Sequence, residues 1–198
     1  VLADQRNVLG ALSGIPDRLF PSRLYGKGFT VTEFGYANPN LYRAVGPALM
    51  AAYGAFQSWD ALFPFAYAHW LPYAQKPTHT AGFFDITNDP VKAYSQRIGA
   101  QLFLNAGIRP AETRFAGIAT DPFRKDGDTE SPLPFNDLGF LAQIGLVAEL
   151  PAQGEYAALI NLGIGSAQSQ KTFPAKKDLI DNLLKAGLLP KGCYDAKT

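Results

Sequence analysis

An alternation of predicted strands and helices between residues 29 and 105 most constrains how this chain folds. Phe29–Phe34 is a run of aromatic and β-branched residues with a single charge, which is typical of a buried strand. Between Leu41 and Ser58 the apolar residues recur at three- and four-residue steps, which predicts an amphipathic helix. A second strand is expected at Ala61–Tyr67 and a second helix at Val91–Asn105. This order indicates a parallel α/β fold and excludes an all-β one.

Helix-start signals mark both predicted helices. Asn38-Pro39 supplies an N-cap residue followed by proline in the first turn, and Asn88-Asp89-Pro90 supplies the same signal for the second helix. Pro47 lies inside the first helical pattern, so it predicts either a kink or a later start. The strand candidate at Ala61–Tyr67 contains Pro64, which removes one donor from a strand ladder.

The character of the chain changes beyond Arg109, and we predict two domains, residues 1–109 and 110–198. The first 14 residues lack periodicity and are expected to form a loop. The other expected elements are a short helix at Pro16–Tyr25, an exposed loop at Asp121–Asn136, apolar segments at Leu138–Leu150 and Tyr156–Ile164, and a helix at Lys176–Ala186.

Composition excludes several classes of function. The 198 residues include 18 basic and 17 acidic ones, without a basic stripe, so no nucleic-acid partner is expected. No apolar run approaches the roughly 18 residues that span a membrane, so no membrane partner is expected. The single cysteine, Cys193, excludes an internal disulfide. The only histidine besides His69 is His79, in a Pro/Thr stretch, so neither a metal site nor a cofactor is predicted.

Glu33 is the strongest catalytic candidate. It is the only acidic residue of an apolar strand, near the point where the strand gives way to a loop. In parallel α/β barrels catalytic groups lie at the carboxyl ends of the strands. A carboxylate is costly to bury without a partner, so we expect Glu33 to be half desolvated and hydrogen-bonded. The alternative is a structural glutamate that forms an ion pair with an arginine.

Aromatic and amide side chains cluster after both predicted strands. The candidate substrate-binding residues are Phe34, Tyr36 and Asn38 after the first strand, and Tyr67, His69 and Trp70 after the second. Sugars need this mixture, because their C–H faces stack on rings and their hydroxyl groups pair with amides and carboxylates. The alternative for each residue is core packing, helix capping or, for His69, a satisfied structural histidine.

Four stretches together resemble a known family. Val31–Gly35, Pro39–Arg43, Ala51–Asp60 and Phe65–Tyr67 are similar to the late-barrel segment of the large retaining clan of (β/α)₈-barrel glycoside hydrolases. The resemblance covers roughly residues 27–106. It implies that the chain holds the last βα units of a (β/α)₈ (TIM) barrel, followed by a small C-terminal α+β extension.

The resemblance also implies a reaction. In that clan the seventh strand ends in the nucleophilic glutamate, here Glu33, and the eighth often ends in a tryptophan that lines the subsite of cleavage, here Trp70. The acid/base belongs to the fourth strand, usually in an Asn-Glu pair, about 5–5.5 Å from the nucleophile. No such segment precedes Phe29. The chain is therefore interpreted as a fragment that lacks the N-terminal barrel half, is inactive alone and takes a carbohydrate substrate. An extracellular or periplasmic location follows from the resemblance only.

Two alternatives remain open. The first is a non-catalytic carbohydrate-binding or structural α/β domain. The second is another enzyme class, for which Gly163–Ala167 superficially resembles a nucleophile elbow but lacks the Gly-x-Ser-x-Gly spacing. No glycine-rich phosphate loop follows a predicted strand, which disfavours nucleotide chemistry.

Overall fold

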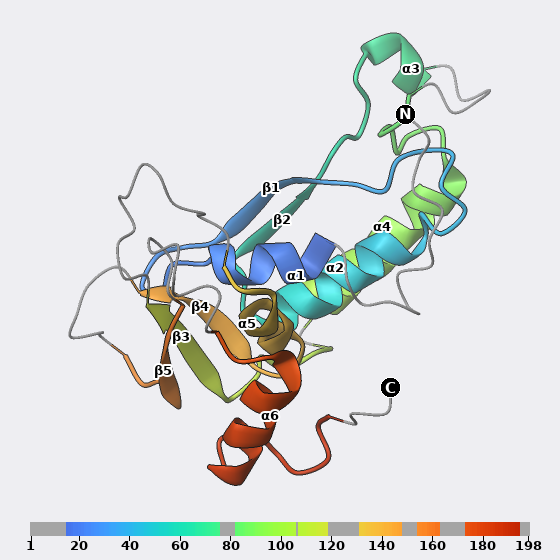
Figure 1. Ribbon diagram of the computed structural model, residues 1–198. Helices are drawn as coiled ribbons and strands as arrows, with labels where there is room; N and C mark the ends of the chain where they lie inside the picture. The colour runs from blue at the N-terminus through green and yellow to red at the C-terminus, as the bar shows by residue number, and fades with distance from the viewer. Residues whose placement is uncertain are drawn as a thin grey trace. The chain divides into compact units, whose positions relative to one another are not determined.

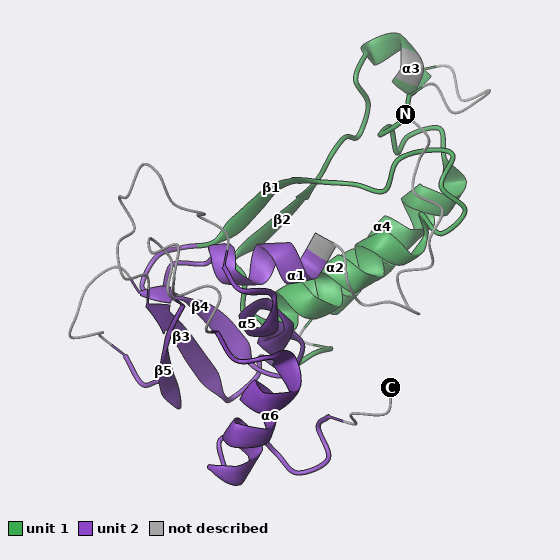
Figure 2. Cartoon of the chain, viewed as in Figure 1, with its two compact units in different colours: residues 1–14, 29–109 green, residues 15–28, 110–198 purple. Residues whose placement is uncertain are grey.

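The computed structural model describes residues 15–75, 82–105, 107–118, 131–147, 154–162 and 173–194. Figure 2 shows that the chain forms two compact units, of which unit 1 comprises residues 1–14 and 29–109 and unit 2 comprises residues 15–28 and 110–198. Residues 15–28 thus belong with the C-terminal half, whereas the sequence-based division placed them in the first domain. The reason is a pair of backbone hydrogen bonds, Tyr25 N–H to the Leu146 carbonyl (2.9 Å) and Leu146 N–H to the Arg23 carbonyl (2.7 Å).

Unit 1 is built on two parallel strands, β1 (Thr30–Phe34) and β2 (Ala61–Pro64) (Figure 1). The helix α2 (Val45–Phe56) lies between them in the chain. Because parallel neighbours need a crossover connection, these three elements form a β–α–β unit, as the strand and helix patterns predict. Together with the parallel sheet of unit 2, this unit confirms the α/β class.

Two further helices follow β2 in unit 1, the short α3 (Leu71–Gln75) and the long α4 (Pro90–Leu104). The predicted second helix is thereby confirmed, with Pro90 in its first turn and Asp89 as its N-cap. Figure 1 shows α2 and α4 running side by side, and the two helices pack on each other. Gly99 permits this close approach, because a Cβ atom there would lie 2.9 Å from the Pro47 carbonyl oxygen.

The helix α2 starts later than Asn38-Pro39 predicts. The amide groups of Asn38 do not cap it, because its backbone N–H donates to the Phe83 carbonyl (2.6 Å) and its side chain donates to the Gly82 carbonyl (3.2 Å). Asn40 instead accepts the Tyr42 N–H at 2.7 Å, and residues 41–44 form turns. The later start places Pro47 in the first turn of α2, where proline is tolerated.

The sheet of unit 2 has the order β4–β3–β5, with β3 (Arg114–Ile118) between β4 (Gln143–Val147) and β5 (Ala158–Asn161). Both pairings are parallel. The expected α+β extension is therefore wrong for the described residues, since α+β domains are built on antiparallel sheets. Helical segments between β3 and β4 make the parallel crossover instead.

The helical segments of unit 2 differ from the predicted ones at two places. The expected helix at Pro16–Tyr25 is split into α1 (Ile15–Leu19) and a 3₁₀ turn, η1 (Phe20–Ser22), after which the chain runs along β4. The expected loop at Asp121–Asn136 contains most of helix α5 (Leu133–Asp137), because Phe135 is fully buried and anchors it. A second 3₁₀ turn, η2 (Leu138–Phe140), and helix α6 (Lys176–Lys185) complete the unit.

Each unit has an apolar core of its own. The core of unit 1 contains Val31, Phe34, Tyr36, Leu49, Met50, Ala51 and Trp59, and that of unit 2 contains Phe20, Phe115, Phe135, Leu138, Ile144, Leu162 and Ile180. Among the described residues no helix is long and apolar enough to cross a membrane. The predicted N-terminal loop, His79 and Gly163–Ala167 lie outside the described residues.

The packing of Tyr36 on α2 predicts the effect of a small substitution. A Cβ atom at Gly46 would lie 2.0 Å from a ring carbon of Tyr36, so Gly46→Ala forces the buried ring to move. We expect a loss of about 1–3 kcal/mol in the free energy of unfolding, which exceeds the roughly 1 kcal/mol that alanine gains in helix propensity. Urea unfolding followed by tryptophan fluorescence measures this, since both tryptophans lie in unit 1.

Gly107→Ala is the matched control, because a Cβ atom there has only one neighbour within 4 Å, at 3.9 Å. Equal stability losses in the two variants would contradict the packing of Tyr36 against Gly46.

Candidate functional site

The carboxyl ends of β1 and β2 carry most of the candidate residues. The two strands are parallel, with Thr30 opposite Ala61 and Val31 opposite Leu62. The pairing continues past β2, because the Phe65 N–H donates to the Phe34 carbonyl at 2.7 Å. Since parallel strands end at the same edge of their sheet, the residues that follow both strands start from a common edge.

A β-bulge determines how Glu33 is presented. The register shifts between Val31 and Phe34, since Phe34 pairs with Pro64, two positions after the partner of Val31. In a regular strand Glu33 would share the inward face with Val31. The extra residue instead leaves Thr32 and Glu33 exposed and turns Phe34 into the core. Glu33 is therefore not half desolvated, as the sequence led us to expect.

The Glu33 carboxylate makes no hydrogen bond or ion pair with another described residue. The alternative of a structural Glu–Arg ion pair therefore has no support in the described part of the chain. An exposed carboxylate on a bulge at a strand end is free to meet a ligand.

A short segment, residues 82–87, holds the chain that leaves β2. The Ala66 N–H donates to the Phe84 carbonyl (3.3 Å), the Ile86 N–H donates to the Ala66 carbonyl (3.1 Å), and the Thr87 N–H donates to the Tyr67 carbonyl (3.1 Å). Two peptide bonds in this region are cis, Asn38–Pro39 and Phe65–Ala66. The backbone from Phe65 to Tyr67 is thus fixed on both sides, by β1 and by residues 84–87.

His69 is held by a buried carboxylate that the sequence did not single out. Asp85 is 1% exposed, and its Oδ1 atom accepts the His69 backbone N–H (3.1 Å) and lies 2.5 Å from His69 Nδ1. The His69 ring packs edge-to-face on Phe65, with centroids 5.0 Å apart, while its side chain remains 43% exposed. The ring is therefore fixed in orientation and open to solvent.

Exposed aromatic rings lie near His69 in the sequence and on the segment that holds it. Tyr67 and Trp70 are 73% and 60% exposed, and Phe83 and Phe84 are also exposed. Phe84 contacts both Phe65 and His69 through its ring. These exposed rings therefore come from two segments, residues 67–70 and 83–84.

Three of the predicted binding residues take other roles. Phe34 and Tyr36 are each 8% exposed, because the bulge and the α2 packing direct their rings into the core, so neither ring face is open to a sugar. Asn38 uses its backbone N–H and side-chain amide to hold Phe83 and Gly82. Glu33, Tyr67, His69 and Trp70 remain available to solvent.

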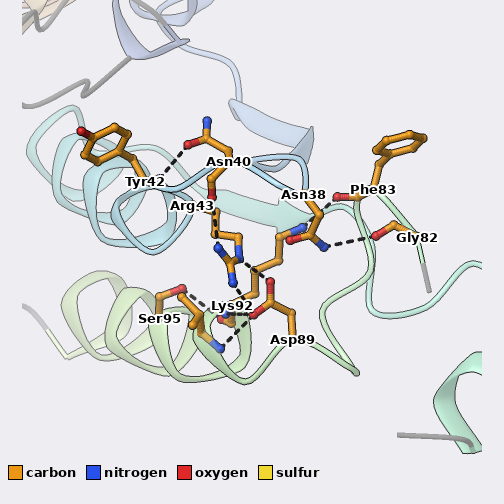
Figure 3. A network of polar contacts seen from close by, with 10 residues as sticks. Asn38, Asn40, Tyr42, Arg43, Gly82, Phe83, Asp89, Lys92 and Ser95 are labelled. Atoms are coloured by element: carbon orange, nitrogen blue, oxygen red, sulfur yellow. Dashed lines mark hydrogen bonds and ion pairs between the residues drawn. The ribbon is translucent and has the colours of Figure 1, made fainter. Parts of the chain in front are cut away.

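A polar network connects the 82–87 segment to α4 and to the turns that precede α2 (Figure 3). Arg43 binds Asp89 through its Nε (2.5 Å) and Nη2 (3.4 Å) atoms, and Asp89 also accepts the N–H groups of Val91 and Lys92. The Lys92 ammonium donates to the Phe83 carbonyl at 3.0 Å. Asp89 was predicted as a helix cap, whereas its pairing with Arg43, 46 positions away, had no local sequence signal.

The network shifts the acidity of its charged groups. Burial by itself raises the pKa of Asp89, but the hydrogen bonds from Arg43 and the helix N–H groups outweigh it and hold that pKa below its ordinary value. Burial lowers the pKa of the Lys92 ammonium, more than the carboxylates of Asp89 and Asp85 raise it. Asp89 thus stabilises the site as a charged carboxylate.

A cavity in unit 1 lies away from most of the candidate residues. It has a volume of about 270 Å³ and is lined by residues of β2, α2 and α4, including Leu62, Phe63, Phe103 and Leu104. Phe34 is its only lining residue among the predicted site residues. The described residues contain no group of three His, Cys, Asp or Glu side chains suited to hold a metal ion. The candidate site is therefore an open surface at the strand ends.

Comparisons with protein-family models, curated proteins and solved structures find no match to this chain.

Asp89→Ala tests the network. The substitution removes the N-cap of α4 and the carboxylate that pairs with Arg43, so we expect a loss of about 2–4 kcal/mol in the free energy of unfolding at neutral pH. Because the folded-state pKa of Asp89 is lowered, its contribution is present above the unfolded pKa and is lost as the pH falls through the folded pKa. The difference between wild type and variant should therefore shrink toward about pH 2.

Urea unfolding followed by tryptophan fluorescence at both pH values measures this difference. Asp60→Ala is the control, since Asp60 is an exposed carboxylate that accepts one backbone N–H, from Phe29 at 2.7 Å. Its loss should be about 1 kcal/mol or less. An Asp89→Ala effect no larger than this would contradict the anchoring role of the network.

Proposed function

We propose that this chain supplies the nucleophile and part of the saccharide-binding surface of a retaining glycoside hydrolase. Glu33 is the nucleophile, and Tyr67, His69 and Trp70 contact the sugar. The observation that carries the proposal is the exposed carboxylate on the bulge of β1, at the same sheet edge from which the aromatic segment after β2 departs.

The barrel is part of this proposal. The order β1–α2–β2–α4, with parallel strands and packed helices, is what two consecutive βα units of a (β/α)₈ barrel would show. Such units place their functional groups at the carboxyl ends of the strands. Glu33 and the residues after Phe65 stand at those ends.

The chemistry follows from the carboxylate. Glu33 attacks the anomeric carbon and forms a glycosyl ester, while a second carboxylic acid protonates the departing oxygen. Water then hydrolyses the ester, with the second residue acting as base. In the proposed barrel that second residue belongs to another βα unit, about 5–5.5 Å from the nucleophile.

A covalent trap tests the nucleophile without the second carboxylic acid. Dinitrophenyl 2-deoxy-2-fluoroglycosides carry a leaving group that departs without protonation, and the fluorine slows hydrolysis of the ester. With a panel of gluco, galacto, manno and xylo reagents, we expect intact-mass spectrometry to show one added glycosyl group. Peptide mapping should place it on Glu33, and Glu33→Gln should abolish it.

Glu112→Gln is the matched control, because Glu112 is an exposed glutamate of the other unit. It should leave labelling unchanged. Labelling that persists in Glu33→Gln, or that maps to another carboxylate, would remove Glu33 from the nucleophile role.

A second candidate function is a non-catalytic carbohydrate-binding surface. The exposure of Tyr67 and Trp70 favours it, since this feature does not depend on Glu33. Saccharide binding without any covalent label would select this alternative.

A further inference from the structure

The carboxylate of Asp85 is buried in an arrangement that a purely structural residue does not need. Its Oδ1 atom contacts both the backbone N–H and the Nδ1 atom of His69, while its buried Oδ2 atom has no hydrogen-bond partner among the described residues. Oδ2 is packed against Gly82, where a Cβ atom would lie 2.8 Å away. Burying a carboxylate with one oxygen unsatisfied is costly. This cost indicates that the charge beside His69 has a use.

The ring of His69 is confined by more than Asp85. Phe65 meets it at 89° with a centroid distance of 5.0 Å, and Phe84 lies 6.3 Å away at 36°. The two rings thus pack on His69 while its Nδ1 atom faces the buried carboxylate. Nε2 has no partner among the described residues, and 43% of the side chain is exposed.

The charge of Asp85 determines which nitrogen carries the proton. A carboxylate only accepts hydrogen bonds, so the neutral imidazole must carry its proton on Nδ1. Nε2 then presents a lone pair to solvent, as in other histidines whose Nδ1–H is held by a carboxylate. Such a nitrogen accepts a hydrogen bond from a hydroxyl group, and the exposed rings of Tyr67 and Trp70 precede and follow His69 in the chain.

We propose that Asp85 is a positioning residue that fixes His69 in the Nδ1–H tautomer, so that His69 Nε2 accepts a hydrogen bond from a hydroxyl of the bound saccharide. This inference rests on the proposed carbohydrate function. It adds Asp85 to the proposed site and specifies that His69 acts through Nε2, as a hydrogen-bond acceptor. If Asp85 were only structural, it would accept the His69 backbone N–H, and removing its charge would not change the tautomer of the His69 ring.

Nuclear magnetic resonance of the ¹⁵N-labelled full chain reads the tautomer directly. Two-bond ¹H–¹⁵N correlations distinguish a protonated ring nitrogen from a bare one, and His79→Gln assigns the signals, because the chain has two histidines. With the ring neutral, we expect a protonated Nδ1 and a bare Nε2. Asp85→Asn keeps an acceptor for the backbone N–H but removes the charge, so it should shift the population toward Nε2–H.

Asp60→Asn is the matched control, because Asp60 also accepts a backbone N–H, from Phe29, but is an exposed carboxylate. It should leave the His69 tautomer as in the wild type. A wild-type Nε2–H tautomer, or an Asp85→Asn variant with unchanged tautomer, would overturn the positioning role.

Saccharide titration of the wild type tests the hydrogen bond from a saccharide hydroxyl to His69 Nε2. This test remains possible even if Asp85→Asn does not fold. The probes are tetrasaccharides of β-linked glucose, galactose, mannose and xylose. The binding probe should move the Nε2 resonance much more than Nδ1, and Asp85→Asn should weaken its affinity about five- to tenfold.

The two proposals fail in different ways. Binding that leaves Nε2 unmoved would overturn the role of His69 while the carbohydrate function stands. Absence of binding by every probe would overturn the saccharide hydrogen bond together with the carbohydrate function, and the tautomer measurement would still report on Asp85 separately.

Discussion

The parallel pairing of β1 with β2 is the constraint on which the rest of unit 1 depends. Because the strands run in the same direction, α2 must cross between them, and α4 then packs on α2. The same pairing brings the end of β1, with Glu33, to the edge from which the chain leaves β2. A bulge at that edge exposes the carboxylate, so one irregularity in the ladder separates a core position from a solvent-exposed one.

Buried charged groups hold the two segments that carry the exposed rings, residues 65–70 and 82–89. Asp89 ties Arg43 to the start of α4, and Lys92 reaches from α4 to the Phe83 carbonyl. Asp85, a few residues before Asp89, holds His69. The 82–89 segment thus uses both of its aspartates to fix backbone and ring positions, while its phenylalanines stay exposed. Rigid support beneath exposed rings lowers the entropy cost of binding a ligand.

Local sequence patterns predicted the elements whose formation is signalled by neighbouring residues. The β-branched run at Phe29–Phe34 and the Asp89-Pro90 cap gave a strand and a helix where the structure has β1 and α4, because the composition of the strand and the capping signal of the helix are local in the sequence. The patterns did not predict the role of a side chain where that role depends on a partner far away in the sequence. Asn38 looks like a cap but is used by residues 82–83, Glu33 is turned outward by a register shift, and Asp85 meets His69 across 16 positions. The periodicity of a single sequence does not show which distant residues pair with each other.

The most direct test of the account is whether the aromatic segment after β2 binds saccharide. Tyr67 and Tyr94 are matched, since they are 73% and 68% exposed and both lie in unit 1, but Tyr94 is on α4, outside that segment. Affinities for the same tetrasaccharides should fall about three- to tenfold in Tyr67→Ala and stay at the wild-type value in Tyr94→Ala. Equal affinities in the two variants, or a larger loss in Tyr94→Ala, would contradict the proposed site.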